Sequence, residues 1–267
     1  MKEPAATFIF QSDDTFNQPS DSVYTIASRS LLPDVNSDDF LIHKTGFTIA
    51  YSCGYRSARW VAYTLTAEET RATVRRKNHF VADTVPDSCL VVPEDYKRSG
   101  FDKGHLAPSA DLCWSLQTMQ ESFCMTNMSP QKPRFNRGMW KKLEDQVRDW
   151  AVENDSVYIV TGPVLGPGLP VIGLSRICIP EFFYKVILDF SGPEVKAIAF
   201  VMANKRLTGE LSEYAVSVDS VESLTGLDLF SVLPESTELL VESSVNLQAW
   251  LWNGKALRIE DEEVDEE

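Results

Sequence analysis

Apolar and polar residues alternate in several segments of the chain with the two-residue period that is typical of β-strands. Residues 45–52 and 59–66 are rich in β-branched and aromatic side chains, and a Cys-Gly-Tyr-Arg segment lies between them. This arrangement predicts a β-hairpin. Further along the chain, three apolar runs predict central strands at 157–161, 182–189 and 195–202. The Pro- and Gly-rich segment between the first two runs predicts a loop.

A helical period is visible in fewer places. The longest predicted helix begins at Asn136 or Arg137 and continues to about Glu153, and asparagine is a residue type that commonly caps a first turn. Shorter helices are expected at 115–121 and 219–225, the second of which is followed by a glycine stop. Strands and helices together predict an α+β fold, with a central mixed or antiparallel sheet and flanking helices.

The length of 267 residues is sufficient for one large domain with a substantial core. No linker rich in Gly, Ser or Pro and no internal repeat divides the chain. We therefore predict a polar N-terminal extension with short strands at 1–40, a single domain at 41–255 and an acidic tail at 256–267. No apolar run approaches the ~20 residues that span a bilayer, and residues 1–30 show no secretory signal or transit peptide. We expect no membrane segment and leave the compartment open.

The net charge of −14 is unusual for a protein that binds nucleic acids. The charge is unevenly distributed: residues 41–150 contain 16 Lys and Arg against 12 Asp and Glu, whereas the rest of the chain contains 9 basic and 27 acidic residues. Positive charge is therefore concentrated in the middle of the chain. The acidic end at Glu260–Glu267 is interpreted as a solvated tail. The alternative is an acidic element that reduces non-specific binding of nucleic acids.

Cysteine usage gives little direct information about chemistry. The chain has five cysteines and no C-x-x-C pair, so a zinc site is not expected. An odd number leaves at least one free thiol, and the spacing identifies no disulfide. We interpret most of the cysteines as small buried apolar residues.

Residues suited to phosphodiester chemistry occur between 96 and 150. His105 ends an Asp-Lys-Gly-His segment in a turn-rich setting. On the long predicted helix, Asn136, Trp140 and Glu144 lie four apart, so we expect them to form one stripe. Many cations surround this stripe. A histidine base, a neutral oxygen ligand, a carboxylate and nearby cations together indicate phosphodiester cleavage with a hard metal ion.

The same stretch resembles a known family. Asp-Lys-Gly-His followed by Leu-Ala-Pro, and the block T-N-M-S-P-Q…N-R-G-M-W-K-K-L-E at 126–144, closely resemble the signature of the DNA/RNA non-specific endonucleases, the ββα-metal nucleases. A weaker resemblance extends from about residue 46 to about residue 230. It implies a ββα-metal finger beside the sheet and hydrolysis of DNA and RNA that leaves 5′-phosphate ends. Lys103 departs from the usual D-R-G-H motif, and lysine lacks the planar fork of arginine.

The resemblance also implies roles for individual residues. His105 is the expected general base, while His43 and His79 are interpreted as structural. An arginine that precedes an aromatic residue and an aspartate is expected to stabilise the transition state. Arg76 is assigned to this role, and Arg75 is the alternative because the loop varies in length.

For the metal, the resemblance implies Asn136 as the direct ligand of Mg²⁺, with Mn²⁺ as an alternative ion. Glu144 is expected to hold the waters of the ion, and Asn127 to support the site through the backbone or His105. Asp102 is expected to orient its loop or cap a turn. Phosphate contacts are expected from four cations: Arg75, Lys103, Arg137 and Lys141.

The expected partners are DNA and RNA. Relatives in the family are often homodimers, which gives a prior for a homodimer here, but the sequence itself does not name the oligomeric state. Two rival functions remain open at this point. A catalytically silent nucleic-acid-binding protein could share the fold, although such a protein would be free to lose His105, Asn136 or Glu144, and all three are present. The second rival is a phosphodiesterase for small or lipid substrates, which stays open because the chain is so acidic.

Overall fold

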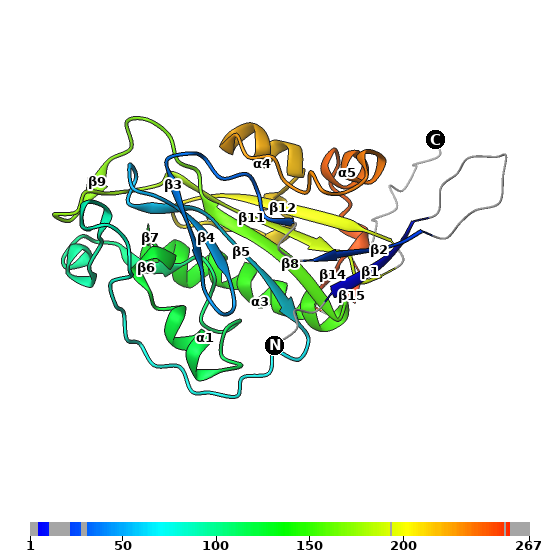
Figure 1. Ribbon diagram of the computed structural model, residues 1–267, viewed down its shortest axis with the longest axis horizontal. Coiled ribbons are helices and arrows are strands. Elements are labelled where there is room, and N and C mark those ends of the chain that lie inside the picture. Colours follow the sequence, from blue (N-terminus) through cyan, green and yellow to red (C-terminus); the bar gives the residue numbers. More distant parts are fainter. Residues whose placement is uncertain (1–4, 11–21, 28–30, 193, 254, 257–267) are drawn as a thin grey trace, which may run out of the picture.

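A seven-stranded antiparallel sheet forms the centre of the computed structural model (Figure 1), which describes residues 5–10, 22–27, 31–192, 194–253 and 255–256. The strand order is β13-β12-β11-β8-β5-β4-β3. The strands are β3 (Asp39–His43), β4 (Thr48–Ser52), β5 (Ser57–Thr66), β8 (Ser156–Pro163), β11 (Phe182–Asp189), β12 (Lys196–Ala203) and β13 (Ala215–Val216).

The predicted hairpin and the three predicted central strands are confirmed. The hairpin is β4 and β5, which pair antiparallel with a register shift at Ala50/Tyr51. The central strands are β8, β11 and β12, and β11 has the predicted bounds. All neighbouring strands of the large sheet run antiparallel, which selects one of the two predicted sheet types. The α+β class is confirmed.

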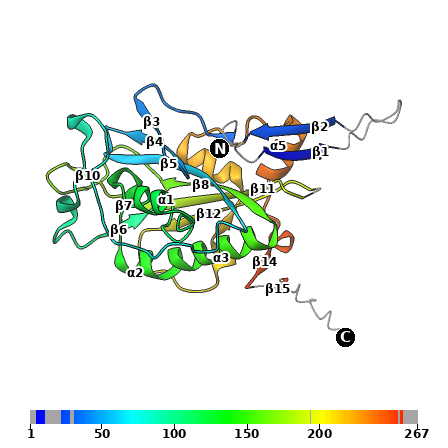
Figure 2. The ribbon, with the colours of Figure 1, turned by 60° about the horizontal axis from the view of Figure 1, so that its bottom comes forward.

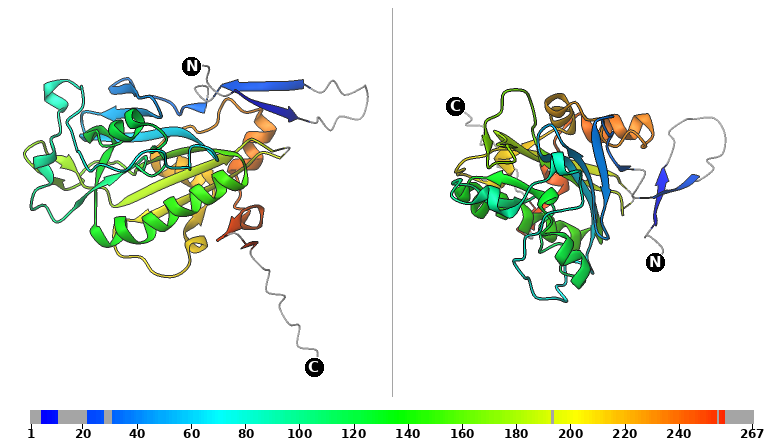
Figure 3. Two further views of the ribbon diagram at one scale, coloured as in Figure 1. Left: turned by 90° about the horizontal axis from the view of Figure 1, so that it is seen from below. Right: turned by 60° about the vertical axis from the view of Figure 1, so that its left-hand side comes forward.

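Helices cover both faces of the sheet. In Figure 1, α4 (Val218–Thr225) and α5 (Glu235–Glu242) lie on one side, and α1 (Leu116–Glu121) and α3 (Lys141–Glu153) lie on the other, as Figure 3 shows from below. Alternate side chains of β11 explain these two layers. Phe183 and Ile187 pack in the cluster on the α3 side, whereas Tyr184 and Val186 pack in the cluster on the α4 side. None of the described helices has the length and apolarity that a membrane span requires.

Two-stranded antiparallel ladders form separately from the main sheet. They are β1 (Ala5–Phe10) with β2 (Ser22–Ala27), β9 (Val171–Ile172) with β10 (Ile177–Cys178), and β14 (Leu251–Trp252) with β15 (Lys255–Ala256). The expected short N-terminal strands are thus present. Leu31 is buried in the core and its carbonyl accepts a hydrogen bond from Tyr158 at 3.0 Å. The domain limits stay a prediction, and Glu260–Glu267 lies outside the described residues.

A ββα unit stands beside the sheet (Figure 2). It consists of β6 (Asp102–His105), β7 (Met128–Gln131) and a helix that starts with α2 (Pro133–Phe135), passes through a π turn at Asn136–Trp140 and continues as α3. The prediction that Asn136 caps this helix is wrong. The helix begins one turn earlier because Pro133 fits the first helical position, with Lys132 as the cap residue.

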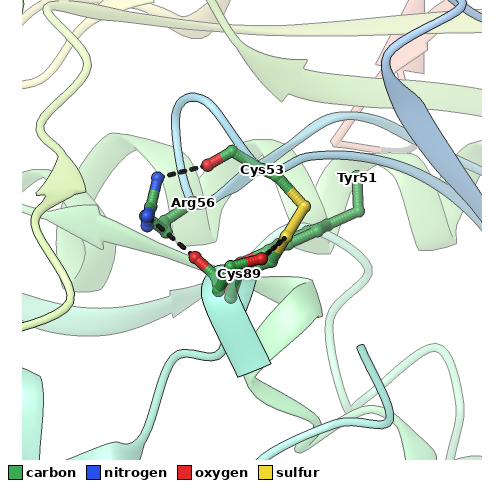
Figure 4. The surroundings of a disulfide bond; sticks show 5 residues. Tyr51, Cys53, Arg56 and Cys89 are labelled. Carbon is green, nitrogen blue, oxygen red and sulfur yellow. Dashed lines mark hydrogen bonds between the residues drawn. A yellow bond between two sulfur atoms is a disulfide. The ribbon is translucent and has the colours of Figure 1, made fainter. Parts of the chain in front are cut away.

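A disulfide between Cys53 and Cys89 joins the β4–β5 turn to the segment that leads to β6 (Figure 4). Arg56 reinforces it by donating hydrogen bonds to the carbonyls of Cys53 and Ser88, and the Tyr51 hydroxyl donates to the Cys89 carbonyl at 3.0 Å. The other three cysteines are buried free thiols. Sequence spacing did not indicate this pair because the two residues meet only in the folded chain.

Candidate active site

The glycine of the Asp-Lys-Gly-His segment permits a close crossing in the ββα unit. Gly104 pairs with Ser129 in the β6–β7 ladder. A Cβ atom added to Gly104 would lie 2.1 Å from Oε1 of Gln131, so any side chain would collide. The fully buried Gln131 side chain therefore crosses β6 at a position without a side chain. The next residue of β6 is His105, whose backbone is fixed by this packing.

The His105 imidazole is enclosed by aromatic rings. Phe123 meets it edge to face at 4.8 Å between centroids, and Phe80 lies at 5.9 Å. The side chain is buried, and Nε2 has no hydrogen-bond partner among the described residues. Burial, together with the positive charge of Arg76, lowers the pKa of His105 from 6.5 to about 3. The ring is therefore neutral at physiological pH and can accept a proton.

Arg76 approaches the same aromatic pair from an exposed loop between β5 and β6. Its guanidinium carbon lies 5.5 Å from the centroid of Phe123, within cation–π range. Nε donates a hydrogen bond to Asn78 at 2.8 Å. Phe80 belongs to the same loop and contacts both His105 and Phe123. The loop therefore brings a cation and a ring to the histidine together.

Asp83 anchors the far end of this loop. Its carboxylate accepts hydrogen bonds from Lys44 Nζ at 2.6 Å, from the Thr126 hydroxyl and from the Thr84 backbone at 2.8 Å. Burial raises the pKa of Asp83, but the hydrogen bonds from Lys44 and Thr126 outweigh burial and bring the pKa below its ordinary value. The three residues of the arginine-aromatic-aspartate spacing therefore have different functions in the fold. Arg76 brings a cation to the site, Phe80 packs on His105, and Asp83 holds the loop in place.

Asp102 orients the first residues of the π turn. The Asn136 Nδ2 atom donates to Asp102 Oδ2 at 3.0 Å, and Arg137 donates to both carboxylate oxygens at 2.8 and 2.7 Å. A carboxylate only accepts hydrogen bonds, so the amide of Asn136 must turn its nitrogen to Asp102. Its Oδ1 atom has no hydrogen-bond partner among the described residues. A neutral hard oxygen is left available as a ligand.

The π turn decides which side chains share a face with Asn136. It contains one residue more than an α turn would, and Gly138 within it has non-helical dihedral angles (φ −110°, ψ −113°). Trp140 is therefore turned into the core and is fully buried, while Glu144 faces the same hollow as Asn136. The predicted stripe is wrong for Trp140, because we assumed a regular helical period.

Buried charges lie beneath Glu144. Asp111 accepts hydrogen bonds from the Tyr63 hydroxyl at 2.8 Å and from Arg148 at 2.6 Å. Lys185, in the middle of β11, is 1% exposed, and its Nζ atom donates to a backbone carbonyl of the loop after β6 at 3.4 Å. Burial raises the pKa of Glu144 and lowers that of Lys185, and each of the two opposes the change in the other. Two cations thus offset the charge that two carboxylates bring into the interior.

These elements surround a hollow of about 720 Å³. Its lining includes four residues predicted as catalytic or metal-binding: Arg76, His105, Asn136 and Glu144. They come from the loop after β5, the end of β6 and the helix of the ββα unit. The hollow therefore combines a neutral imidazole, a guanidinium and two kinds of hard oxygen. An oxygen-seeking divalent cation fits the amide oxygen of Asn136 with the carboxylate of Glu144 nearby.

Two predicted residues do not line the hollow. Asn127 is fully buried, where its Oδ1 accepts from the Ala107 N–H at 3.0 Å and its Nδ2 donates to the carbonyls of Ala107 and Ser122 at 2.9 and 2.8 Å. It holds the loop that follows His105 and acts on the site through the backbone. Arg75 and Arg76 are both exposed, but only Arg76 lines the hollow.

The other three expected phosphate-binding cations do line the hollow. Lys103 Nζ lies 4.9 Å above the Phe80 ring. Arg137 is largely exposed, and its fork is engaged by the Asp102 carboxylate. Lys141 pairs with Asp145, one turn further along α3, at 2.5 Å. Lys103 therefore has no ion-pair partner among the described residues, whereas Arg137 and Lys141 each have one.

Sequence reasoning missed part of the supporting structure. Asp102 was expected to orient a loop or cap a turn, and instead it binds Asn136 and Arg137. Asp111 and Lys185 received no role. A signal for Lys185 was present, because it is a lysine within the apolar run 182–189, and such a residue needs a buried partner. Asp111 gave no comparable signal.

Comparison with known proteins places the chain in a family. Residues 32–236 match the model of the DNA/RNA non-specific endonuclease family. A nuclease from Nostoc sp. is 31% identical over 85% of this chain and 88% of its own length, and the mitochondrial endonuclease G of Caenorhabditis elegans is 32% identical over 77% and 72%. A crystal structure of an EndoG/EndoGI complex superimposes with a TM-score of 0.71 at 28% identity, over 74% of this chain and 89% of that one. The chain therefore belongs to the DNA/RNA non-specific endonuclease family and is a nuclease.

Proposed function

We propose that this nuclease hydrolyses phosphodiester bonds in DNA and RNA with His105 as general base and one bound divalent metal ion, and that it leaves 5′-phosphate ends. One observation carries the proposal. His105, Arg76 and Asn136 come from separate segments of the chain, yet all three side chains line one hollow together with Glu144. Their chemistry matches the needs of phosphodiester hydrolysis: a proton acceptor, a phosphate-binding cation and hard oxygen ligands.

His105 would take the proton of the attacking water. Nε2 is enclosed, so we assign proton uptake to Nδ1. A pKa of about 3 keeps the ring unprotonated but makes it a weak base. Part of this lowering comes from the positive charge of Arg76. A phosphodiester bound beside Arg76 would offset that charge and raise the pKa of His105, so the base would strengthen when substrate is present.

Arg76 would stabilise the charge that develops on the phosphoryl oxygens. Its guanidinium lies on Phe123, the ring that also packs on His105. The shared ring fixes the cation relative to the base before substrate arrives, which is the preorganisation that electrostatic catalysis requires. Its hydrogen bond from Nε to Asn78 leaves the two terminal nitrogens without a hydrogen-bond partner among the described residues and available to phosphate.

Asn136 and Glu144 would hold the metal ion, Mg²⁺ or Mn²⁺. Asn136 offers Oδ1 as a direct ligand because Asp102 holds the amide nitrogen. Glu144 would accept hydrogen bonds from the waters of the ion. When bound, the ion supplies positive charge to a phosphate oxygen and to the leaving oxygen. Because the asparagine ligand is neutral, it leaves that charge undiminished.

The test is cleavage of supercoiled plasmid and of single-stranded RNA by purified protein, with Mg²⁺, with Mn²⁺ and with EDTA. Cleavage of both substrates that EDTA abolishes is expected. His105→Ala should remove most cleavage and retain binding, whereas His79→Ala, a change at an exposed histidine outside the hollow, should cleave normally. Products should accept a 5′ label only after phosphatase treatment. Tight binding without cleavage under any metal condition would favour the silent nucleic-acid-binding protein.

A further inference from the structure

A second group of carboxylates lies across the sheet from the hollow. Asp219 and Glu222 belong to α4, and Glu242 is the last residue of α5. One carboxylate oxygen of each lies within 4.8 Å of those of the other two. Both helices pack against β12, whereas α3 of the active site packs against the other face of the sheet (Figure 1). This acidic cluster is therefore separate from the active site and independent of the proposed function.

The cluster concentrates negative charge without a compensating cation. Asp219 and Glu222 are three residues apart and share a face of α4, where like charges repel. Glu242 ends α5, and the C-terminal end of a helix dipole disfavours a carboxylate. Among the described residues, no Lys, Arg or His forms an ion pair with any of the three. The other charges that act on Glu242 are those of Glu238 and Asp228, which are also acidic.

The surroundings of Glu242 give independent evidence that a ligand of the carboxylates is missing. Its side chain is only 7% exposed, and its Oε1 atom is buried with no hydrogen-bond partner among the described residues. Glu222 differs, because its Oε1 accepts a hydrogen bond from the Leu229 N–H at 2.6 Å. Burial and the neighbouring carboxylates raise the pKa of Glu242 to about 8. Buried carboxylates in proteins are normally paired or bound to a metal, and neither a cation nor a donor is supplied here by the described chain.

We propose that Asp219, Glu222 and Glu242 bind one Ca²⁺ ion that ties α4 to α5. Ca²⁺ takes oxygen ligands at about 2.3–2.6 Å, so two ligands of one ion lie at most about 5 Å apart, which agrees with the spacing of these oxygens. Mg²⁺ spans only about 4 Å and usually takes one or two carboxylates. Asp219 is exposed, which leaves room for the waters that complete the coordination of the ion.

Calcium binding would be measured by titration calorimetry and by thermal unfolding, on the wild-type chain and on Asn136→Ala, so that an ion bound in the active-site hollow is counted separately. We expect one Ca²⁺ bound outside the hollow, with a rise in Tm. Glu242→Gln should weaken this binding at least tenfold and abolish the rise. Glu235→Gln, which removes a charge from α5 outside the cluster, should leave both unchanged. Cleavage in Mg²⁺ should be equal in all chains that retain Asn136.

Asp219→Asn keeps the inference testable if Glu242→Gln fails to fold, because Asp219 is exposed. Equal calcium affinity in the Asn136→Ala chain with and without Asp219→Asn or Glu242→Gln would overturn the proposal. So would a wild-type Tm that does not respond to Ca²⁺ while Glu242→Gln raises it. In that outcome the three carboxylates only repel one another, and no metal ion joins them.

Discussion

Acid should destabilise the folded protein through His105. The imidazole of the unfolded chain binds a proton near pH 6.5, whereas the folded protein binds it only near pH 3. Between these values the unfolded state holds one proton more. The stability linked to His105 is therefore fully present above the unfolded pKa and is lost as the pH falls below it.

The expected size of this effect follows from the difference between the two pKa values. Each pH unit within that window changes the free energy of unfolding by about 1.4 kcal/mol. Integration from neutral pH to pH 5 gives a loss of about 2 kcal/mol from His105 alone. The side chain is 8% exposed, so solvent screening reduces this value little.

The assay is urea unfolding in EDTA at pH 7.5 and pH 5.0, for wild type, His105→Gln and His79→Gln. The carboxylates contribute equally to all three proteins, so their effect cancels in the comparison. Wild type and His79→Gln should lose about 2 kcal/mol more stability than His105→Gln does on acidification. Equal losses in all three proteins would show that His105 is hydrated and titrates normally, and would refute the reasoning from burial.

Three further predictions concern the active site. Arg76→Ala should lower kcat by two to three orders of magnitude, or ~3–4 kcal/mol, with little change in KM, and Arg76→Lys should recover only part; a selective kcat loss in Arg75→Ala instead would move the role by one residue. Asn136→Ala should weaken metal binding in calorimetry more than Glu144→Ala, and equal effects would contradict the assignment of the direct ligand. Gly104→Ala should destabilise the protein in urea by ~1–3 kcal/mol, because the added methyl group must displace Gln131; unchanged stability would show that this side chain moves freely.

Much of the fold follows from local patterns in the sequence. The strands of the hairpin and the central strands are fully or half buried, so their β-branched and aromatic residues mark them clearly. The body of α3 and the helix stopped by Gly226 were likewise predictable, because their signals are periodic or local. The site residues were named through two short motifs and the arginine-aromatic-aspartate spacing, and the hollow brings four of them together.

The remainder depends on contacts between distant segments. The strand β6 has four residues and pairs with β7 across more than twenty residues of intervening chain, so no local pattern marks it. The π turn cannot be predicted from the helical period of the sequence, because its extra residue interrupts that period. Helix α5 was missed because Leu239 and Leu240 are exposed, and its sequence lacks a clear apolar face. The link from Asp111 through Arg148 to the active-site helix is visible only in three dimensions.

The Cys53–Cys89 bond makes a covalent ring from the intervening chain, which includes β5 and the loop that carries Arg76. Closing a ring between residues 36 apart stabilises the folded state by about 4 kcal/mol in the chain-entropy treatment. The loop also exposes Arg75, Arg76 and Lys77 to solvent, which makes it a substrate for trypsin. A single cut there leaves both new ends attached through sulfur. The nicked protein should therefore run as one piece without reductant and as two pieces with it, and limited trypsinolysis can free the catalytic loop while the scaffold stays joined.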